Sequence, residues 1–140
     1  MHNTSLITRL DARRLRSLTR RLKASGRSRM DHIAALDRRV DSARIVSPRK
    51  IPRNVVTLNS QVMLRDMDSG KRLTLTLADP HDIRMFGDRL SVAGPCGMAL
   101  LGTRVGQIVS WTVGPKLRRF RVEKVIYQPE ALVIFTFDLN

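Results

Sequence analysis

Apolar side chains in the first third of the chain repeat with the spacing of an amphipathic helix. Two runs recur at intervals of three and four residues, over Leu15, Leu18 and Leu22 and over Ile33, Leu36, Val40 and Ala43. This spacing predicts one helix over residues 12–24 and a second over residues 29–44. Because only a short loop separates them, the two apolar seams are expected to meet in a short antiparallel coiled-coil hairpin.

The ends of the first helix carry local signals. Asp11 is expected to be its N-cap, with Leu10 and Leu15 packed across it as a hydrophobic staple. Ser25-Gly26 is expected to end the helix, because glycine readily takes the left-handed conformation of a C-cap. Residues 1–8 show no hydrophobic period and are expected to be frayed.

Beyond residue 60 the hydrophobic period changes to two, the period of a strand. Strands are predicted over residues 61–65 and 71–78, joined as a hairpin by a turn at Asp68-Ser69-Gly70. In the second of these strands Leu73, Leu75 and Leu77 are expected to face the core, and Arg72, Thr74 and Thr76 to face outward.

A second pair of strands is predicted near the end of the chain. Residues 108–113 and 117–127 have strand character and flank a turn at Gly114-Pro115. The phase of the apolar positions switches at Glu123-Lys124, which predicts a β-bulge there. The apolar run Ala131–Phe137 has no assigned place.

The stretch between these strand pairs, residues 89–107, is predicted to organise the fold. It contains a short strand at residues 90–92, a Gly-Pro corner and one or two turns of helix. Pro95 suits the first helical position, and Gly102 suits a left-handed C-cap. We expect this small helix to plug a sheet that wraps around it, and to be a docking surface.

These elements predict an α+β fold in two parts. Residues 1–47 would form a basic helical finger, and residues 55–140 a β-sheet domain. Pro48 and Pro52 break helical structure, so the intervening residues 48–54 are predicted to be a linker.

Composition adds a strong charge. The 140 residues carry a net charge of +14, of which +11 lies on residues 1–53, so an anionic partner or surface is expected. No apolar stretch is long enough to span a membrane, and the N-terminus lacks the apolar region of a signal peptide. The single cysteine, Cys96, excludes an internal disulfide and suits the reducing cytoplasm.

Much of the charge on the first helix falls on one face, which has two interpretations. The row consists of Arg13, Arg16, Arg20, Lys23 and Arg27. It is either a solvated face that Asp37 and Asp41 of the second helix partly neutralise, or a surface for nucleic acid or an acidic protein.

Motifs for catalysis or for cofactors are not found. The glycines near residues 94–102 fit no phosphate-binding loop, and the three histidines have no metal-ligand spacing. Asp79, His81 and Asp82 are interpreted as a solvated loop, and Cys96 as a small buried apolar residue. We therefore expect neither an enzyme nor a metal or cofactor.

A series of motifs within residues 54–130 resembles the C-terminal domain of the Gre family of transcript cleavage factors. The motifs are VVTLNSQVMLRD, DSGK, LSVAGPCGMALLGTRVGQ and IYQPE, in that order. The resemblance implies an FKBP-like twisted antiparallel sheet around a short helix. It also implies binding to core RNA polymerase at the rim of the secondary channel, with the finger pointing inward. We expect a cytoplasmic monomer.

Two departures from the family pattern qualify this expectation. The polymerase-contacting corner, a Ser-Pro pair in cleavage factors, is occupied here by Gly94, Pro95, Cys96 and Gly97. Cleavage factors carry acidic fingertips that help to hold Mg²⁺, whereas the nearest carboxylate here is Asp31. The tip instead completes a basic finger surface, which consists of Arg13, Arg16, Arg20, Lys23, Arg27 and Arg29.

The sequence therefore predicts a non-catalytic regulator that binds RNA polymerase and competes with cleavage factors without stimulating cleavage. The alternatives are a cleavage or elongation factor of the Gre type, and a basic nucleic-acid-binding protein. A peptidyl-prolyl isomerase is the enzymatic alternative on this fold, but its apolar pocket needs aromatic walls. The chain offers few candidates for such walls, namely Phe86, Trp111, Phe120 and Tyr127.

Overall fold

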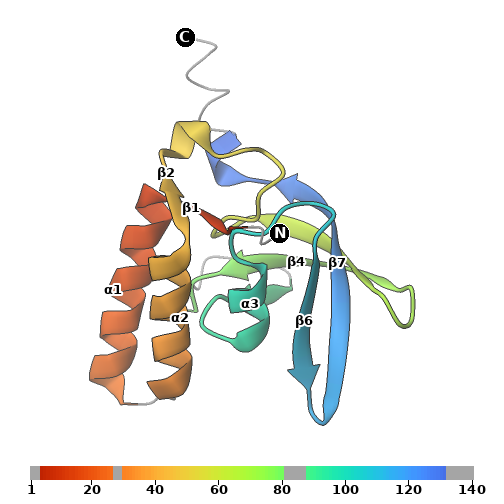
Figure 1. The fold of residues 1–140 in the computed structure, drawn as a ribbon, viewed down its shortest axis with the longest axis horizontal. Coiled ribbons are helices and arrows are strands. Elements are labelled where there is room, and N and C mark those ends of the chain that lie inside the picture. The colour runs from red at the N-terminus through yellow and green to blue at the C-terminus, as the bar shows by residue number, and fades with distance from the viewer. Residues whose placement is uncertain (1–3, 27–29, 81–87, 132–140) are drawn as a thin grey trace.

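Two antiparallel helices form the N-terminal part of the molecule (Figure 1). The computed structural model describes residues 4–26, 30–80 and 88–131. Helix α1 covers Arg9–Ser25 and helix α2 covers Met30–Ser42, which confirms both predicted helices. The predicted seam is buried at Leu15, Leu18, Leu22, Ile33, Leu36 and Val40. Gly26 has φ 65° and caps α1, as expected.

The start of α1 differs from the prediction. Thr8 is the N-cap, and its hydroxyl oxygen accepts a hydrogen bond from the Asp11 amide at 3.1 Å. The predicted cap at Asp11 and the staple are therefore wrong, since Leu10 is 46% exposed. The helix begins earlier because the Thr8 side chain provides an acceptor for the otherwise unpaired Asp11 amide of the first turn.

A two-stranded parallel sheet ties the N-terminus to the end of the hairpin. Strand β1 covers Leu6–Thr8, strand β2 covers Arg44–Val46, and Ile7 pairs with Ile45. The expectation that residues 1–8 are frayed is thus wrong for the described residues of β1, which are buried. The predicted linker contains a 3₁₀ turn, η1, over Pro48–Lys50, and Ile51 is buried beyond it.

Within the described residues, the main sheet has five strands in the order β5-β4-β3-β7-β6. They are β3 (Gln61–Asp66), β4 (Arg72–Ala78), β5 (Arg89–Ser91), β6 (Ile108–Val113) and β7 (Lys116–Tyr127). The pairs β3–β4, β3–β7 and β6–β7 are antiparallel, but the edge strand β5 runs parallel to β4. The expectation of an antiparallel sheet is therefore wrong at this edge. A parallel pair needs a long connection between its strands, and ten residues separate Ala78 of β4 from Arg89 of β5.

The details of β4 and β7 follow the sequence pattern in part. The register between β3 and β7 shifts between Met63 and Leu64, where Glu123 is the extra residue, so the predicted bulge is confirmed. In β4, Leu75 and Leu77 are buried as expected, but Leu73 is 37% exposed and Thr76 is buried. Leu73 pairs with Leu64 close to the turn of the β3–β4 hairpin, at the end of β4 where the strand begins.

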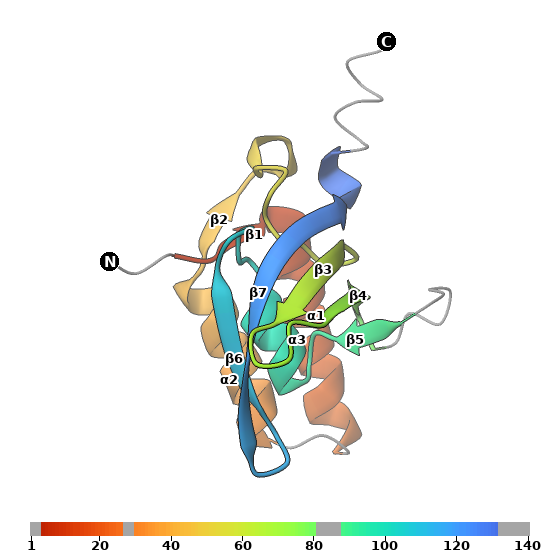
Figure 2. The same cartoon turned by 90° about the vertical axis from the view of Figure 1, so that its right-hand side faces the viewer.

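One hydrophobic core joins the hairpin to the sheet. Helix α3 (Pro95–Leu100) lies between the hairpin and β6, and all three helices lie on one side of the sheet (Figures 1 and 2). A single cluster of buried side chains includes Leu18 and Leu36 of the hairpin together with Leu64 of β3 and Leu100 of α3. The division into finger, linker and sheet domain stays a prediction, and this shared core bears on it. No helix among the described residues is long and apolar enough to cross a membrane.

Candidate functional site

The segment that the sequence marks as a docking surface forms a tight corner between β5 and α3. Gly94 is the N-cap of α3 and Pro95 occupies the first turn, where the missing proline N–H costs no helical hydrogen bond. The Gly94 amide donates to the Ser91 carbonyl at 3.2 Å, and the Met98 amide donates to the Gly94 carbonyl at 2.9 Å. These bonds fix where Pro95 lies relative to the sheet.

Gly97 makes the corner possible because the helix approaches the preceding turn closely. A Cβ atom at Gly97 would lie 2.0 Å from the Ser91 carbonyl oxygen, closer than any real contact. At Gly94 the corresponding distance is 3.6 Å, which is ordinary contact. Gly97 is buried and serves this packing, whereas Pro95 is exposed and Gly94 and Cys96 are half-buried. Burial also raises the pKa of the Cys96 thiol, so the thiol stays protonated near neutral pH.

Arg39 of α2 links the hairpin to the end of α3, and the sequence pattern does not mark it. Its terminal Nη2 donates to the carbonyls of Leu101 at 2.8 Å and Ala99 at 3.3 Å. Both carbonyls belong to the C-terminal end of α3, where a cation complements the helix dipole. Desolvation lowers the pKa of the Arg39 guanidinium from its usual value, and the group remains a cation at any physiological pH. The corner is therefore held from the hairpin side as well as from the sheet.

A buried polar junction lies where α1 meets the segment before β3. The Asp11 carboxylate accepts a hydrogen bond from the Leu58 amide at 3.0 Å, and the Thr57 hydroxyl donates to Glu130 at 2.7 Å. Burial raises the pKa of Asp11 to about 6, and the negative charge of nearby Glu130 adds to the effect. This junction joins residues that are 47 and 73 positions apart, so no local sequence signal could have shown it.

The predicted basic finger surface is partly neutralised. Arg16 pairs with Asp41 and lies 3.6 Å from Asp37, and Lys23 lies 3.1 Å from Asp37. Burial tends to raise the pKa of Asp37, but the hydrogen bond from Lys23 and the neighbouring cations outweigh it and hold the pKa below its usual value. Partial neutralisation by the second helix is therefore observed for Arg16 and Lys23, and a surface for nucleic acid or an acidic protein stays a prediction for the row.

The other cations of the basic finger surface have no carboxylate partner where the structure describes them. Arg13 and Arg20 are exposed, and within the described residues no ion pair or hydrogen bond engages their side chains. Arg27 and Arg29 lie outside the described residues. At the tip Met30 is 64% exposed, and the side chain of Asp31 accepts a hydrogen bond from the His32 amide at 3.1 Å.

The three candidate aromatic rings that the structure describes do not line a common pocket. Trp111 and Phe120 are buried and stacked, with ring centroids 4.3 Å apart and planes 10° from parallel, so they fill the core. Tyr127 is exposed on the sheet, and Phe86 lies outside the described residues. Among the residues that the structure describes, no three His, Cys, Asp or Glu side chains are grouped to hold a metal ion. His81 and Asp82 of the predicted solvated loop, and residues 132–137 of the apolar run, also lie outside the described residues.

Comparisons with known proteins agree on one family. The model described as transcription elongation factor GreA/GreB, C-terminal, matches residues 51–127. The regulator of nucleoside diphosphate kinase of Escherichia coli K12 is 36% identical over 129 residues, which cover 91% of this chain and 93% of that protein. Transcription elongation factor GreA of Syntrophomonas wolfei is 28% identical over 93 residues, or 66% of this chain and 58% of that protein.

A solved structure supports the same assignment. The prokaryotic transcription elongation factor GreA/GreB from Nitrosomonas europaea superposes with a TM-score of 0.71 and is 32% identical, and the match covers 90% of this chain and 100% of that one. The family model includes the corner and both strand pairs of the main sheet. The resemblance drawn from the sequence motifs is therefore confirmed, and this protein belongs to the GreA/GreB family of transcription elongation factors.

Proposed function

We propose that this protein is a cytoplasmic transcription regulator that binds core RNA polymerase at the entrance of the secondary channel. The observation that carries the proposal is the family match over residues 51–127, which includes the corner at Gly94, Pro95, Cys96 and Gly97. In this proposal Pro95 and its half-buried neighbours contact the polymerase, and the finger points into the channel.

The construction of the corner supports a docking role. Pro95 is exposed, whereas the backbone around it is fixed by the Gly94 and Met98 amides and by Arg39 at the far end of α3. A rigid, exposed apolar group loses little conformational entropy when it is buried by a partner. Such a group suits docking better than a long, flexible side chain does.

The proposal also holds that the protein does not stimulate transcript cleavage. Assisted cleavage requires anionic oxygen atoms that bring a second metal ion to the polymerase active site. The described residues at the tip of the hairpin offer the basic Lys23, the apolar Met30 and a single carboxylate, Asp31. The protein would therefore occupy the site of a cleavage factor without replacing its chemistry.

The basic finger surface has a place in this proposal. Arg13 and Arg20 are exposed cations on the outer face of α1, and Arg16 and Lys23 beside them are paired with Asp37 and Asp41. The unpaired members would contact acidic polymerase surface or nucleic acid near the channel. A cleavage factor of the Gre type remains the alternative function, and its distinguishing property is accelerated cleavage.

The test is direct binding to purified core RNA polymerase together with competition against a labelled cleavage factor. We expect a complex at micromolar protein and moderate salt, and displacement of the label. Pro95→Ala should raise the Kd several-fold with the free energy of unfolding nearly unchanged. Pro115→Ala, in the exposed Gly-Pro turn between β6 and β7, is the matched control and should bind like the wild type.

Two results would contradict the proposal. The absence of any complex would refute polymerase binding altogether. Equal effects of the two proline substitutions on affinity would show that the corner is an ordinary turn and that the docking surface lies elsewhere.

A further inference from the structure

The outer face of the main sheet, defined here as the face turned away from α1, α2 and α3, carries cations in aligned rows. Side chains of directly paired residues lie on the same face of a sheet. Arg65 of β3 pairs with Arg72 of β4 on one side and with Arg121 of β7 on the other. The next row places Met63 beside Lys124, and the row after it places Gln61 beside Tyr127. Figure 2 shows the sheet in front of the helices, so this face is not covered by them.

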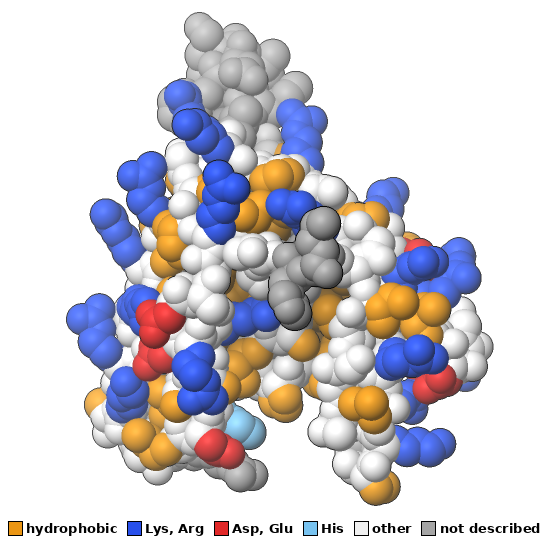
Figure 3. Space-filling view, viewed as in Figure 1, with side chains coloured by type: hydrophobic (Ala, Val, Ile, Leu, Met, Phe, Trp, Pro, Cys, Tyr) orange, Lys and Arg blue, Asp and Glu red, His pale blue; other side chains and the backbone are white. Residues whose placement is uncertain are grey.

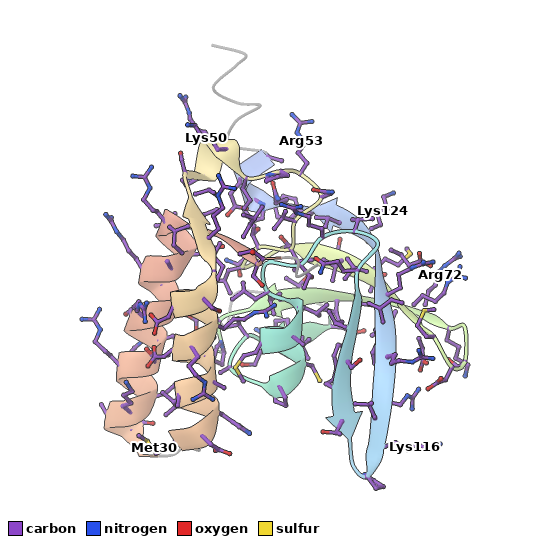
Figure 4. All side chains as sticks on the ribbon, viewed as in Figure 1. Met30, Lys50, Arg53, Arg72, Lys116 and Lys124 are labelled. Carbon is purple, nitrogen blue, oxygen red and sulfur yellow. The ribbon has the colours of Figure 1, made fainter. Side chains whose placement is uncertain are left out.

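These side chains surround a shallow, open hollow. It is lined by Met63, Arg65, Arg72, Arg121, Glu123 and Lys124. Figure 3 shows Lys and Arg side chains gathered over the sheet side of the molecule, and Figure 4 shows Arg72 and Lys124 on the side away from the hairpin. One apolar side chain, four cations and one carboxylate therefore make up the lining.

The single carboxylate leaves most of the positive charge available. Glu123 Oε1 lies 2.6 Å from Arg65 Nε, without the alignment of a hydrogen bond, and 3.8 Å from Arg72 Nε. Within the described part of the chain, no ion pair or hydrogen bond engages the side chains of Arg121 and Lys124. Glu123 therefore holds two guanidinium groups in place, while the cations of β7 face solvent.

An exposed aromatic ring extends this cationic face. Tyr127 is 43% exposed and stands two rows from Arg121 on the same strand and face. A basic surface beside an exposed aromatic ring suits single-stranded nucleic acid, because unpaired bases stack on rings while their phosphates meet arginine and lysine. Duplex bases are already stacked on each other and have no free face for Tyr127. An acidic protein segment would use the cations but would have no use for the ring.

We propose that the outer face of β3, β4 and β7 is a binding surface for single-stranded nucleic acid, with Arg121 and Lys124 on phosphates and Tyr127 stacked on a base. The proposal concerns a surface separate from the corner and from the basic finger surface. It does not rest on the proposed docking to RNA polymerase, and the free protein is sufficient to test it.

The experiment measures fluorescence anisotropy of labelled 12-nucleotide oligo-U and oligo-dT with the full-length protein, over a series of salt concentrations. We expect both single strands to bind more tightly than a duplex of equal length. Arg121→Gln/Lys124→Gln should raise the Kd at least tenfold and reduce the slope of log K against log salt by about 1.4, two contacts at about 0.7 each. Tyr127→Leu should raise the Kd at least fivefold and leave the slope unchanged.

Two further variants sharpen the comparison. Glu123→Gln removes the carboxylate of the hollow and should lower the Kd. Arg13→Gln/Arg20→Gln removes the same number of exposed, unpaired charges from α1 and is the matched control for net charge. All substituted side chains are at least partly exposed, and thermal unfolding will verify that each variant is folded.

Each possible result decides for or against the proposal. A loss of single-strand affinity in Arg121→Gln/Lys124→Gln and in Tyr127→Leu, but not in the α1 variant, supports it. If Arg13→Gln/Arg20→Gln loses as much affinity as Arg121→Gln/Lys124→Gln, the strand binds through overall charge, and the proposal is overturned. Displacement by poly-glutamate with no effect of Tyr127→Leu would assign the face to an acidic protein, and the absence of single-strand binding in low salt would also refute it.

Discussion

The buried carboxyl group of Asp11 is the side chain that most clearly couples the finger to the sheet. Its pKa rises from the ordinary value of 3.8 to about 6, first because it is buried and second because Glu130 is close. The folded protein therefore binds a proton at Asp11 more tightly than the unfolded chain does. The contribution to stability is complete below about pH 4 and is lost as the pH rises through 6.

This direction of the pH dependence of stability gives the first prediction. From the two pKa values, Asp11 should make the protein about 1.3 kcal/mol more stable at pH 5 than at pH 7. Asp11→Asn should remove this difference, because the amide keeps an acceptor for the Leu58 N–H and does not titrate. Urea unfolding of both proteins at the two pH values measures it. An unchanged pH dependence in the Asn variant would show that other groups cause it.

The roles of buried charged residues such as Asp11 and Arg39 could be predicted only in part from the sequence. Asp11 lies just before an apolar run, which is the usual position of an N-cap, but its carboxylate accepts a hydrogen bond from the distant Leu58 amide and lies near the like charge of Glu130. Arg39 is one of many arginines, and nothing local indicates that it reaches α3. Both roles depend on long-range contacts. Only the high cost of burying an unpaired charge suggests, once the fold is known, that such groups must have partners.

Among the helices and strands, those with strong local patterns were predicted well. The two helices, the β3–β4 and β6–β7 hairpins, α3 and the bulge at Glu123 follow from apolar period, turn residues and phase. The elements that were missed or mistaken, β1, β2 and the parallel pairing of β5, have only three residues each. Strands this short form because a neighbouring segment completes their hydrogen bonds, and a local pattern does not record that neighbour.

The shared core leads to a second prediction, for the hairpin. The sequence suggests a finger attached to an independent sheet, whereas Leu18 and Leu36 lie in one cluster with Leu64. Leu18→Ala should cost about 3 kcal/mol, because it leaves a cavity in this core. Leu10→Ala, at a position that is 46% exposed, is the control and should cost less than about 0.5 kcal/mol.

The same variants test whether the hairpin and the sheet unfold together. Far-ultraviolet circular dichroism follows the helices, and the fluorescence of the single tryptophan, Trp111 in β6, follows the sheet. We expect the two transitions to coincide and to shift together in Leu18→Ala. If only the helical signal shifts, the hairpin is the independent attachment that the sequence suggests.

The molecule as a whole distributes its charge of +14 over distinct surfaces. One is the outer side of α1 and another is the outer face of the sheet, and the uncharged corner at Pro95 lies apart from the cations of both. Binding through phosphates should fall steeply with salt, whereas docking through an apolar corner should persist. Salt dependence can therefore separate nucleic-acid binding from polymerase binding in one preparation.

The last prediction concerns cleavage of RNA in a backtracked polymerase complex. Helix α1 has 17 residues, a length of about 25 Å. Near the tip of the hairpin, Leu22 of α1 and Ile33 of α2 still belong to the core that joins the hairpin to the sheet. A hairpin that is short and held along its length reaches less far than a free rod would. At its tip Lys23 repels a cation, and Asp31 is one carboxylate where a second metal ion needs several oxygen ligands.

Addition of this protein and Mg²⁺ to a backtracked complex should therefore leave the RNA at its intrinsic rate of cleavage. A known cleavage factor in the same assay is the positive control, and excess of this protein should suppress its effect by competition. Gel analysis of labelled RNA over time measures both rates. An acceleration that disappears in Asp31→Asn would mean that this carboxylate does deliver a metal ion, because the substitution removes its charge and leaves the basic surface of the hairpin unchanged.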